Sequence, residues 1–386
     1  VKEINILIAS DSFKGSLSSI EVANSMERGF LKTGYKVNIS KLPIADGGEG
    51  TVEAVTLALG GEFMDFEVDD VFRNPTTATL GVLNSGSVII EAASPLGLDK
   101  INSEDLNPMV ASSFGLGQMI LHALDLGAKR IYIGLGGSAV NDGGLGLITA
   151  LGAKPLDKNN NPIRDGALGL EDVCEIDIFN LDKRLKSVEI FLLSDVTNPL
   201  CGKTGATYIY GPQKGIEVKD LELVDSWMKN YGKLLQELFK YDVSIVPGAG
   251  AAGGLGAALI AFANAKMNKG IEKILEMIDI ETKMQKSDIV FTGEGKMDIQ
   301  SKYGKAPIGI AKLAKKYNLP VVAIVGSVEN SAIDNVSQEI DLILNIINEP
   351  MSLEKAMDNV ESLVETTAYM ALNCFAKWKS MFECLD

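Results

Sequence analysis

Four glycine-rich segments hold the residues of this sequence whose types and spacing are best suited to chemistry. They are IADGGEGT (44–51), GLGGSAVNDGG (134–144), PGAGAAGGLG (247–256) and FTGEGKMD (291–298), and three of them carry at least one Asp or Glu. Each follows an apolar run that is typical of a buried strand. Glycine admits positive φ and leaves backbone N–H groups open to an anion, while carboxylates bind Mg²⁺. The pattern predicts one anion and metal site assembled from several strand ends.

Two other loops place single polar side chains at the ends of predicted strands. Asp195 follows the apolar run at 188–194, at the kind of sheet edge where α/β proteins bind ligands. Its carboxylate could accept a hydroxyl proton or bind Mg²⁺, and the alternative is a cap of the turn that follows. Ser12 and Lys14 follow the first strand, so they put a hydroxyl and a cation where an anionic substrate would bind, unless the loop is merely solvated.

Two segments resemble known nucleotide-binding motifs, but neither has all the features that its motif requires. The segment 248–253 fits the dinucleotide fingerprint by letter, but Glu272, at roughly the expected distance, falls in a predicted helix. The alternative is a helix N-terminus that packs closely through Gly and Ala. The segment GKT at 202–204 lacks the first glycine of a P-loop, because that position is Thr197.

Composition excludes several classes of protein. The 386 residues include 36 Lys and Arg against 51 Asp and Glu, and this net charge of −15 argues against a nucleic-acid partner. Four scattered cysteines without a C-x-x-C pair and the single histidine, His122, argue against a zinc site. Acid–base chemistry therefore falls to carboxylates or lysine. The cysteine usage and the absence of a signal-peptide profile predict a cytoplasmic protein with no membrane partner.

The order of predicted elements indicates an α/β protein with two domains. The N-terminal part alternates strands and helices, at 4–9, 19–32, 37–42 and 51–59, which is the signature of a parallel sheet. Three alternating segments between residues 63 and 92 have no helix between them and indicate a mixed sheet, and a long helix is predicted at 221–239. A second series of strands and helices follows residue 243, with a strand at 289–292 and helices near 254–267 and 353–376 among its elements. We predict a Rossmann- or flavodoxin-like parallel-sheet domain formed by residues 1–65 plus 280–386. Residues 66–279 would form a second, inserted mixed α/β domain.

Seven segments, in order, resemble those of the bacterial type I glycerate kinases. They are ASDSFKGSLSSIEVA (9–23), LPIADGGEGTVEA (42–54), GLGGSAVNDGG (134–144), SDVTNPLCG (194–202), GPQKG (211–215), PGAGAAGGLGA (247–257) and TGEGKMDIQSKYGKAPIGIA (292–311). One departure is Ser10, where that family usually has proline. The resemblance implies two α/β domains unrelated to P-loop kinases. It also implies ATP- and Mg²⁺-dependent phosphorylation of D-glycerate, usually to 2-phosphoglycerate.

With this resemblance, the residues define a predicted site in three parts. The glycerate site would comprise Asp11, Ser12, Lys14, Asp46, Gly47, Gly48 and Arg73, with Lys14 and Arg73 on the carboxylate. The ATP phosphates would lie on Gly136, Gly137, Ser138, Asn141, Asp142, Gly143 and Gly144, and on Gly293, Glu294 and Gly295. Asp195 and Lys14 would be catalytic, with Asp195 as proton acceptor and Asp298 on Mg²⁺. Alternatively, Asp195 binds the metal and Asp46 or Asp142 accepts the proton.

Other functions remain open on the sequence alone. A related kinase would give 3-phosphoglycerate or act on another small hydroxy acid. An NAD-dependent dehydrogenase would need the missing acidic residue after the segment at 248–253. A two-lobed binding protein for sugar acids would need no carboxylates beside its glycine turns. The expected partners are small molecules, and the protein would be a monomer or a homodimer.

Overall fold

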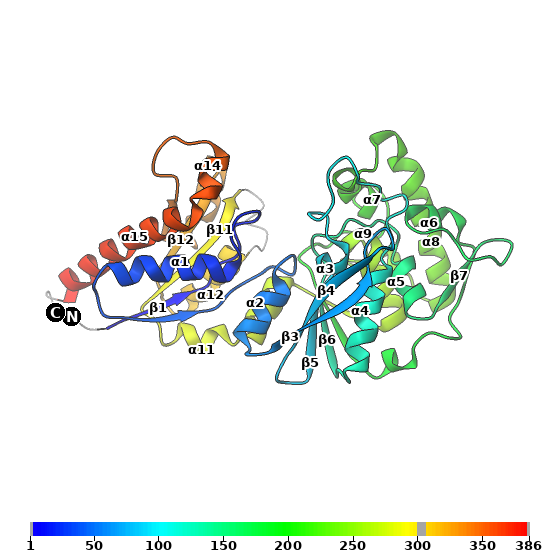
Figure 1. Ribbon diagram of the computed structural model, residues 1–386, viewed down its shortest axis with the longest axis horizontal. Coiled ribbons are helices and arrows are strands. Elements are labelled where there is room, and N and C mark those ends of the chain that lie inside the picture. The colour runs from blue at the N-terminus through cyan, green and yellow to red at the C-terminus, as the bar shows by residue number, and fades with distance from the viewer. Residues whose placement is uncertain (1–2, 299–305, 384–386) are drawn as a thin grey trace. The chain divides into compact units, whose positions relative to one another are not determined.

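The computed structural model describes residues 3–298 and 306–383, and the chain divides into two compact units (Figure 1). The first unit comprises Val1–Asp46, Glu53–Ala58 and Ile271–Asp386, and the second comprises Gly47–Val52 and Leu59–Gly270. The boundaries differ from the predicted ones, because residues 47–52 and 59–65 belong to the second unit and residues 271–279 to the first. Residues 299–305, inside the last of the seven segments, lie outside the described part of the chain.

A parallel sheet forms the centre of the first unit. Its strands run in the order β13-β12-β11-β1-β2 and span Ile4–Ile8 (β1), Val37–Lys41 (β2), Ile289–Met297 (β11), Val321–Val328 (β12) and Leu342–Asn345 (β13). All four neighbouring pairs are parallel. The strand order is that of flavodoxin-like sheets. From β1 the chain adds β2 on one side, and from β11 it adds β12 and β13 on the other, so the strand order reverses between β1 and β11. Ligands of such sheets bind at the carboxyl ends of the two strands that flank the reversal.

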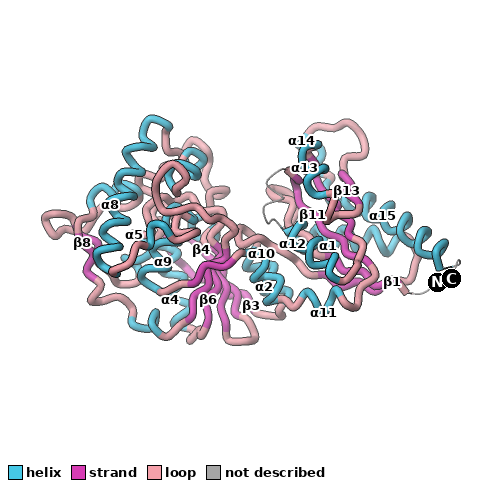
Figure 2. The backbone as a smooth tube through the Cα atoms, turned by 180° about the vertical axis from the view of Figure 1, so that it is seen from behind, coloured by secondary structure: helices cyan, strands magenta, loops and turns pink. Residues whose placement is uncertain are grey.

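Helices α1, α12 and α15 contact this sheet. The helices of the first unit are α1 (Ser19–Lys32), α10 (Gly270–Met277), α11 (Ile280–Met284), α12 (Ala306–Lys316), α13 (Asn330–Val336), α14 (Leu353–Asp358) and α15 (Val360–Glu383), and α2 (Thr51–Ala58) spans the division between the two units. Helix α1 begins with a capping box, in which the side chains of Ser18 and Glu21 each accept a hydrogen bond from the other's backbone N–H. The crossovers from β1 to β2 and from β11 to β12 run in opposite directions. Right-handed connections therefore place α1 and α12 on opposite faces, and α15 packs beside α1 (Figures 1 and 2).

The second unit contains a mixed sheet, whose strands β3, β4 and β6 lie together in Figure 2. Its order is β10-β9-β6-β5-β4-β3, with bounds Glu62–Asp69 (β3), Pro75–Val82 (β4), Ser87–Glu91 (β5), Arg130–Gly134 (β6), Glu189–Leu193 (β9) and Lys266–Asn268 (β10). The predicted mixed character is confirmed, since β3, β4 and β5 are antiparallel and β5, β6, β9 and β10 are parallel. The carboxyl ends of β6, β9 and β10 therefore share one edge.

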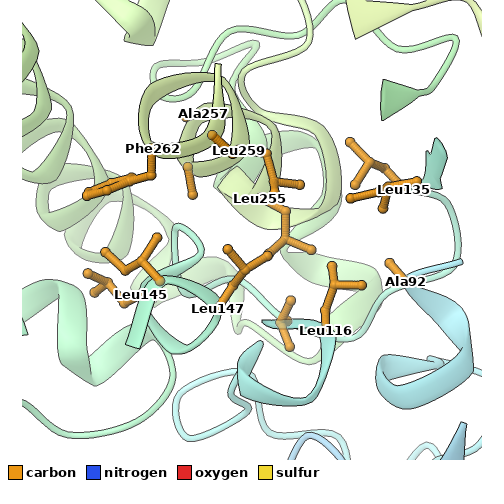
Figure 3. Close-up of a cluster of buried hydrophobic side chains, with 14 of the residues drawn as sticks. Ala92, Leu116, Leu135, Leu145, Leu147, Leu255, Ala257, Leu259 and Phe262 are labelled. Atoms are coloured by element: carbon orange, nitrogen blue, oxygen red, sulfur yellow. The ribbon is translucent and has the colours of Figure 1, made fainter. Parts of the chain in front are cut away.

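A leucine- and alanine-rich core fills the second unit. Its helices are α3 (Ala93–Leu96), α4 (Phe114–Asp125), α5 (Leu145–Ala150), α6 (Ala167–Asp172), α7 (Ala206–Tyr210), α8 (Leu221–Phe239) and α9 (Ala251–Ala263). Short 3₁₀ turns are η1 (Lys183–Lys186), η2 (Pro212–Lys214), η3 (Val218–Asp220) and η4 (Val243–Ile245), and β7 (Lys154–Leu156) pairs with β8 (Glu175–Asp177). Leu116 of α4, Leu147 of α5 and Leu255 of α9 meet in the interior (Figure 3). This packing fixes the loops at the carboxyl ends of β6 and β9.

Three predicted elements differ from the structure. The strand expected at 289–292 continues to Met297, so the segment FTGEGKMD is mostly strand rather than a turn. The helix expected at 353–376 is divided at Asn359 into α14 and α15. The helix expected at 254–267 begins at Ala251, and residues 252–254 have left-handed backbone angles. No helix among the described residues has the length and apolar character that crossing a membrane requires.

Candidate active site

Acidic residues gather where the strand order of the first unit reverses. Asp11 follows β1 and donates its backbone N–H to the carbonyl of Gly293 on β11, over 3.0 Å. Asp11, Asp46 and Glu294 line a hollow of about 600 Å³ together with other polar side chains, which are Ser12, Lys14, Ser16, Lys296, Asp298, Ser327 and Ser352. Apolar residues of the loop after β13 and of α14 complete it. The structure thus brings the predicted residues Asp11, Ser12, Lys14, Asp46, Glu294 and Asp298 to one hollow, in the place that the topology favours for a ligand.

Asp11 is the most perturbed acid of this hollow. Its side chain is 5% exposed, and burial, reinforced by the charges of Asp46 and Glu294, raises its pKa to about 7. The backbone N–H of Ser12, 2.7 Å from Oδ1, and the nearby charge of Lys14 act in the opposite direction. A carboxyl with this pKa exchanges its proton near neutral pH, which is the property required of a general base.

Mg²⁺ would find oxygen ligands in the first unit but no complete protein cage. Among the described residues, no group of three or more His, Cys, Asp or Glu side chains is arranged to hold a metal ion. Mg²⁺ is commonly held by one or two carboxylates together with substrate phosphates and water, so the donor set of this hollow fits such a shared site. The two predicted metal ligands, Asp298 and Asp195, belong to different units.

Gly293, Glu294 and Gly295 do not form the phosphate-binding turn that was predicted. They lie within β11, where Gly293 is registered with Ile324 and Glu294 with Val325 of β12. A Cβ on Gly293 would lie 2.2 Å from the carbonyl oxygen of Ile324, so glycine is needed there for the close approach of two strands. Glu294 nevertheless remains a lining residue of the hollow.

The turn after β6 is the glycine-rich segment that remains suited to bind an anion. The N–H of Gly136 donates to the carbonyl of Gly47 over 3.1 Å, and a Cβ on Gly136 would lie 2.7 Å from the Cα of Gly48. Gly47 and Gly48, predicted as substrate ligands, therefore pack their backbone against this turn within the second unit. Gly137 has φ +76°, and Gly136, Gly137 and Ser138 line a smaller hollow of about 140 Å³.

The remainder of that segment faces the protein interior, which corrects the prediction for residues 141–144. Asp142 is fully buried, and its carboxylate accepts hydrogen bonds from Ser113 N (2.9 Å), Ser113 Oγ (2.7 Å), Gly144 N (2.9 Å) and Gly146 N (3.1 Å). Burial raises the pKa of Asp142, although these hydrogen bonds oppose the shift. Asp142 thus holds the start of α5 in place, and this saturation with structural donors argues against a role as a base or a nucleotide ligand.

Its neighbours have equally structural contacts. The N–H of Gly143 donates to the carbonyl of Gly253 over 3.0 Å, and the N–H of Gly144 donates to Asp142, so neither is open to a phosphate. Asn141 is buried and donates from Nδ2 to Thr207 Oγ1 over 3.1 Å. The N–H of Gly136 is likewise used by the carbonyl of Gly47, so the contacts predicted for ATP phosphates are reduced to Gly137 and Ser138.

Asp195 lies where the sequence places it, in the loop after β9, and it is half-buried. Its Oδ1 accepts a hydrogen bond from the backbone N–H of Gly270 over 3.0 Å, which ties the loop after β9 to the loop after β10. This bond supports the alternative that Asp195 organises the loop. Only Oδ1 of Asp195 takes part in this hydrogen bond with Gly270.

Arg73 is engaged in ways that were not predicted. Its Nε donates to Asp69 Oδ2 over 2.7 Å, and its guanidinium lies 3.5 Å from the centroid of the Phe114 ring. Asp165 is a further acidic neighbour, at 3.7 Å. Arg73 belongs to the second unit and Lys14 to the first, so the structure does not show them together as a pair for one carboxylate.

Sequence reasoning missed Lys214, which lies in the segment GPQKG. Its side chain is 2% exposed, and Nζ donates to the carbonyl of Val140 (2.7 Å) and to Ser138 Oγ (3.4 Å). Burial lowers the pKa of Lys214 to about 7, against the opposing effect of the Asp142 charge. The one available signal was a lysine between two glycines in a segment of the resemblance, but burial cannot be seen in those letters.

Carboxylates at the reversal of a flavodoxin-like sheet lie where α/β enzymes commonly bind their ligands. The model of the glycerate kinase family matches residues 6–376, and the chain belongs to this family. It is 42% identical to a glycerate 2-kinase of Escherichia coli K12, over 92% of this chain and 93% of the relative. It is 38% identical to a glycerate kinase of Bacillus subtilis 168, over 98% and 100%.

A solved structure agrees with this assignment. The crystal structure of a candidate glycerate kinase 2 from Salmonella typhimurium LT2 superposes with a TM-score of 0.86 at 40% identity, covering 98% of this chain and all of that one. The predicted family, the α/β fold class and the enzyme class, a kinase, are therefore confirmed.

The inward-facing glycines give a prediction about stability. In Gly143→Ala, the new Cβ would lie 2.8 Å from Tyr231 Cε1 at a residue with φ +65°. We expect a loss of about 2–5 kcal/mol in the free energy of unfolding, from left-handed strain and overpacking together. The measurement is denaturant unfolding followed by the fluorescence of Trp227 on α8 of the same unit.

Gly202→Ala is the matched control, because Gly202 has φ +92° and a Cβ added there would meet none of the described atoms within 4 Å. It should show the strain alone, about 1–2 kcal/mol. If Gly143→Ala were as stable as this control but bound ATP more weakly, the inward-facing role of Gly143 would be wrong.

Proposed function

We propose that this protein transfers the γ-phosphoryl group of ATP to D-glycerate, with Mg²⁺, to give 2-phosphoglycerate. The observation that carries this proposal is the hollow at the β1–β11 reversal, where Lys14 offers a cation and Asp11 offers a proton acceptor beside further carboxylates. Family membership and relatives named for glycerate support the choice of substrate. The relative named glycerate 2-kinase supports position 2 as the acceptor hydroxyl.

Glycerate is proposed to bind at the polar residues of the larger hollow. Lys14 would pair with its carboxylate, and Ser12 lies beside it in the same loop. The hollow, at about 600 Å³, has more room than a three-carbon acid requires. Selection would therefore depend on charge and hydrogen bonding rather than on the size of the hollow.

Asp11 is proposed as the proton acceptor in place of Asp195. The hydroxyl of glycerate must lose its proton as the phosphoryl group arrives, and the protein mainly aligns and neutralises the reacting groups. A pKa near 7 allows Asp11 to be ionised before transfer and protonated after it. Asp195, held by the N–H of Gly270, would order the edge of the second unit.

ATP phosphates are proposed to meet the backbone of Gly137 and Ser138 in the second unit. Asp298 and Glu294 are the proposed protein ligands of Mg²⁺ in the first unit. Bound there, Mg²⁺ would supply positive charge that offsets the negative charge of the transferred phosphoryl group.

The reaction itself is the first test of this function. A coupled assay of ADP release should show turnover only when ATP, Mg²⁺ and D-glycerate are all present. ³¹P NMR of the product would separate 2-phosphoglycerate from 3-phosphoglycerate. No turnover with D-glycerate, or turnover only with another small hydroxy acid, would overturn the substrate assignment.

Lys14→Met tests the proposed contact with the glycerate carboxylate. The loss of a charged hydrogen bond costs about 1.5–3 kcal/mol, which corresponds to a KM for glycerate raised about ten- to a hundredfold. The KM for ATP should change little, since the lost contact is to the other substrate. A change confined to the KM for ATP would instead assign Lys14 to a phosphate.

Asp11→Asn and Asp195→Asn form a matched pair for the proton acceptor. Both keep the side-chain shape and remove its basicity. We expect kcat to fall about 10²–10⁴-fold in Asp11→Asn and much less in Asp195→Asn. In the unaltered enzyme, kcat/KM should rise with pH through about 7, because Asp11 must be ionised. The reverse ranking of the two variants would restore Asp195 as the acceptor.

The pH dependence of stability gives an independent test of the Asp11 carboxyl. The pKa of Asp11 is about 7 in the folded protein and 3.8 ordinarily, so between these pH values the folded protein binds more protons than the unfolded chain. The free energy of unfolding should therefore fall as pH rises from about 4 to about 7, and this part of the fall should vanish in Asp11→Asn. Thermal unfolding between pH 5 and pH 8 measures it.

A further inference from the structure

The smaller hollow, in the second unit, has an unusual lining for its size. It measures about 140 Å³, and polar side chains reach it from several segments: Ser138, Ser194, Tyr210, Gln213 and Lys214. Since one water molecule occupies about 30 Å³ of liquid, the hollow has room for a phosphate group but not for a whole nucleotide.

Lys214 carries a buried amine whose direct hydrogen-bond acceptors are both uncharged. Its two acceptors, the carbonyl of Val140 and the hydroxyl of Ser138, are uncharged. Within the described part of the chain, no carboxylate lies within the 4 Å of Nζ that defines an ion pair. An ammonium group has three donors, and a buried charge without an opposite charge is strongly disfavoured. The charged form of Lys214 would therefore be stabilised by an anion that enters the hollow.

The backbone around the hollow is shaped for the same purpose. Ala252, another lining residue, has φ +53° and ψ +42°, which is uncommon for any residue other than glycine. It follows Ala251, which is right-handed, and a right-handed residue followed by a left-handed one turns successive N–H groups toward one concavity. Such concavities bind anions.

We propose that this hollow binds a phosphate group, with the ammonium of Lys214 as its counter-charge and Ser138 as a further hydrogen-bonding partner. The inference rests on the proposed function, in which the phosphate belongs either to the nucleotide or to the phosphorylated product. It adds a charged residue to a turn for which only backbone contacts were predicted.

Binding should be linked to proton uptake. In the free protein, burial holds the pKa of Lys214 at about 7, so at pH 7.5 much of it is neutral. A phosphate beside Nζ favours the charged form and draws a proton from the buffer. The other titratable groups near the site are Asp142, whose carboxylate is saturated by hydrogen bonds, and Tyr210.

The experiment is titration calorimetry of the full-length protein at pH 7.5 with inorganic phosphate, ADP, ATP, 2-phosphoglycerate and D-glycerate. It is repeated in two buffers with different ionisation enthalpies, which measures the protons taken up. Lys214→Met is the test variant. Lys203→Met is the control, because Lys203 is exposed and contacts Tyr208 outside the hollow.

We expect Lys214→Met to bind a phosphate-bearing ligand at least tenfold more weakly and without proton uptake, while its affinity for D-glycerate is unchanged. Its melting temperature should stay equal or rise, because a buried polar amine has been replaced by an apolar chain of similar length. Lys203→Met should match the unaltered protein. Loss confined to ADP and ATP would assign the hollow to the nucleotide, and loss confined to 2-phosphoglycerate would assign it to the product.

Undiminished affinity for every phosphate ligand in a folded Lys214→Met would overturn the proposal. So would a lower melting temperature with normal binding, which would make Lys214 a structural residue. If this variant fails to fold, the unaltered protein still decides, since phosphate binding without proton uptake contradicts the proposal. These measurements need no turnover. A protein that binds phosphate in this way but does not phosphorylate glycerate would refute only the proposed function.

Discussion

Backbone packed directly against backbone is the constraint on which the second unit depends. A Cβ on Gly253 would lie 2.1 Å from the carbonyl oxygen of Val140, and one on Gly254 would lie 2.7 Å from the Cα of Gly143. A Cβ on Gly134 would likewise lie 2.6 Å from the carbonyl oxygen of Gly47. Three glycine-rich segments that are distant in sequence therefore pack backbone against backbone at the carboxyl ends of β6 and β9. Side chains larger than hydrogen would separate them.

The buried carboxylate of Asp142 holds the same region together through hydrogen bonds, whereas the glycines act through close packing. One carboxylate gathers hydrogen bonds from Ser113, Gly144 and Gly146 and so joins the start of α4 to the start of α5. Because the carboxylate is buried, its removal would leave several donors unsatisfied at once. The turn at Gly136–Ser138 is thus supported on one side by glycine contacts and on the other by this acid. A rigid support of this kind keeps N–H groups in place without reorganisation when a ligand arrives.

The sequence was informative where local rules decide the structure. The bounds of α1 and α8 follow from a capping box and a strong amphipathic pattern, and both helices appear at the predicted residues. The sequence was less informative about what glycine does. The same letters serve a strand at Gly293, close packing at Gly143 and an open turn at Gly137, since only the three-dimensional neighbours differ.

For charged residues, too, the sequence predicted some positions and missed the contacts that depend on distant segments. Lys14 and Asp11 could be placed from their position after the first strand, because topology alone brings that loop to a ligand edge. Arg73 and Lys214 could not, since their partners lie on other segments. Phe114 and Asp69 engage the arginine, and the carbonyl of Val140 holds the lysine in the interior. Long-range neighbours of this kind leave no spacing pattern in a single sequence.

The route of the chain has a consequence for how the protein is made. The chain passes between the two units after residues 46, 52, 58 and 270, and the central strand β1 pairs with β11, where Ile6 is registered with Ile289. On the ribosome, residues up to 270 emerge before β11 is synthesised, so one edge of β1 has to wait for its partner strand. During that interval, one edge of β1 and the apolar side of α1 are exposed to solvent. Exposed strand edges and apolar surfaces can bind chaperones or aggregate. Strand β1 is therefore synthesised well before the strand that covers its second edge.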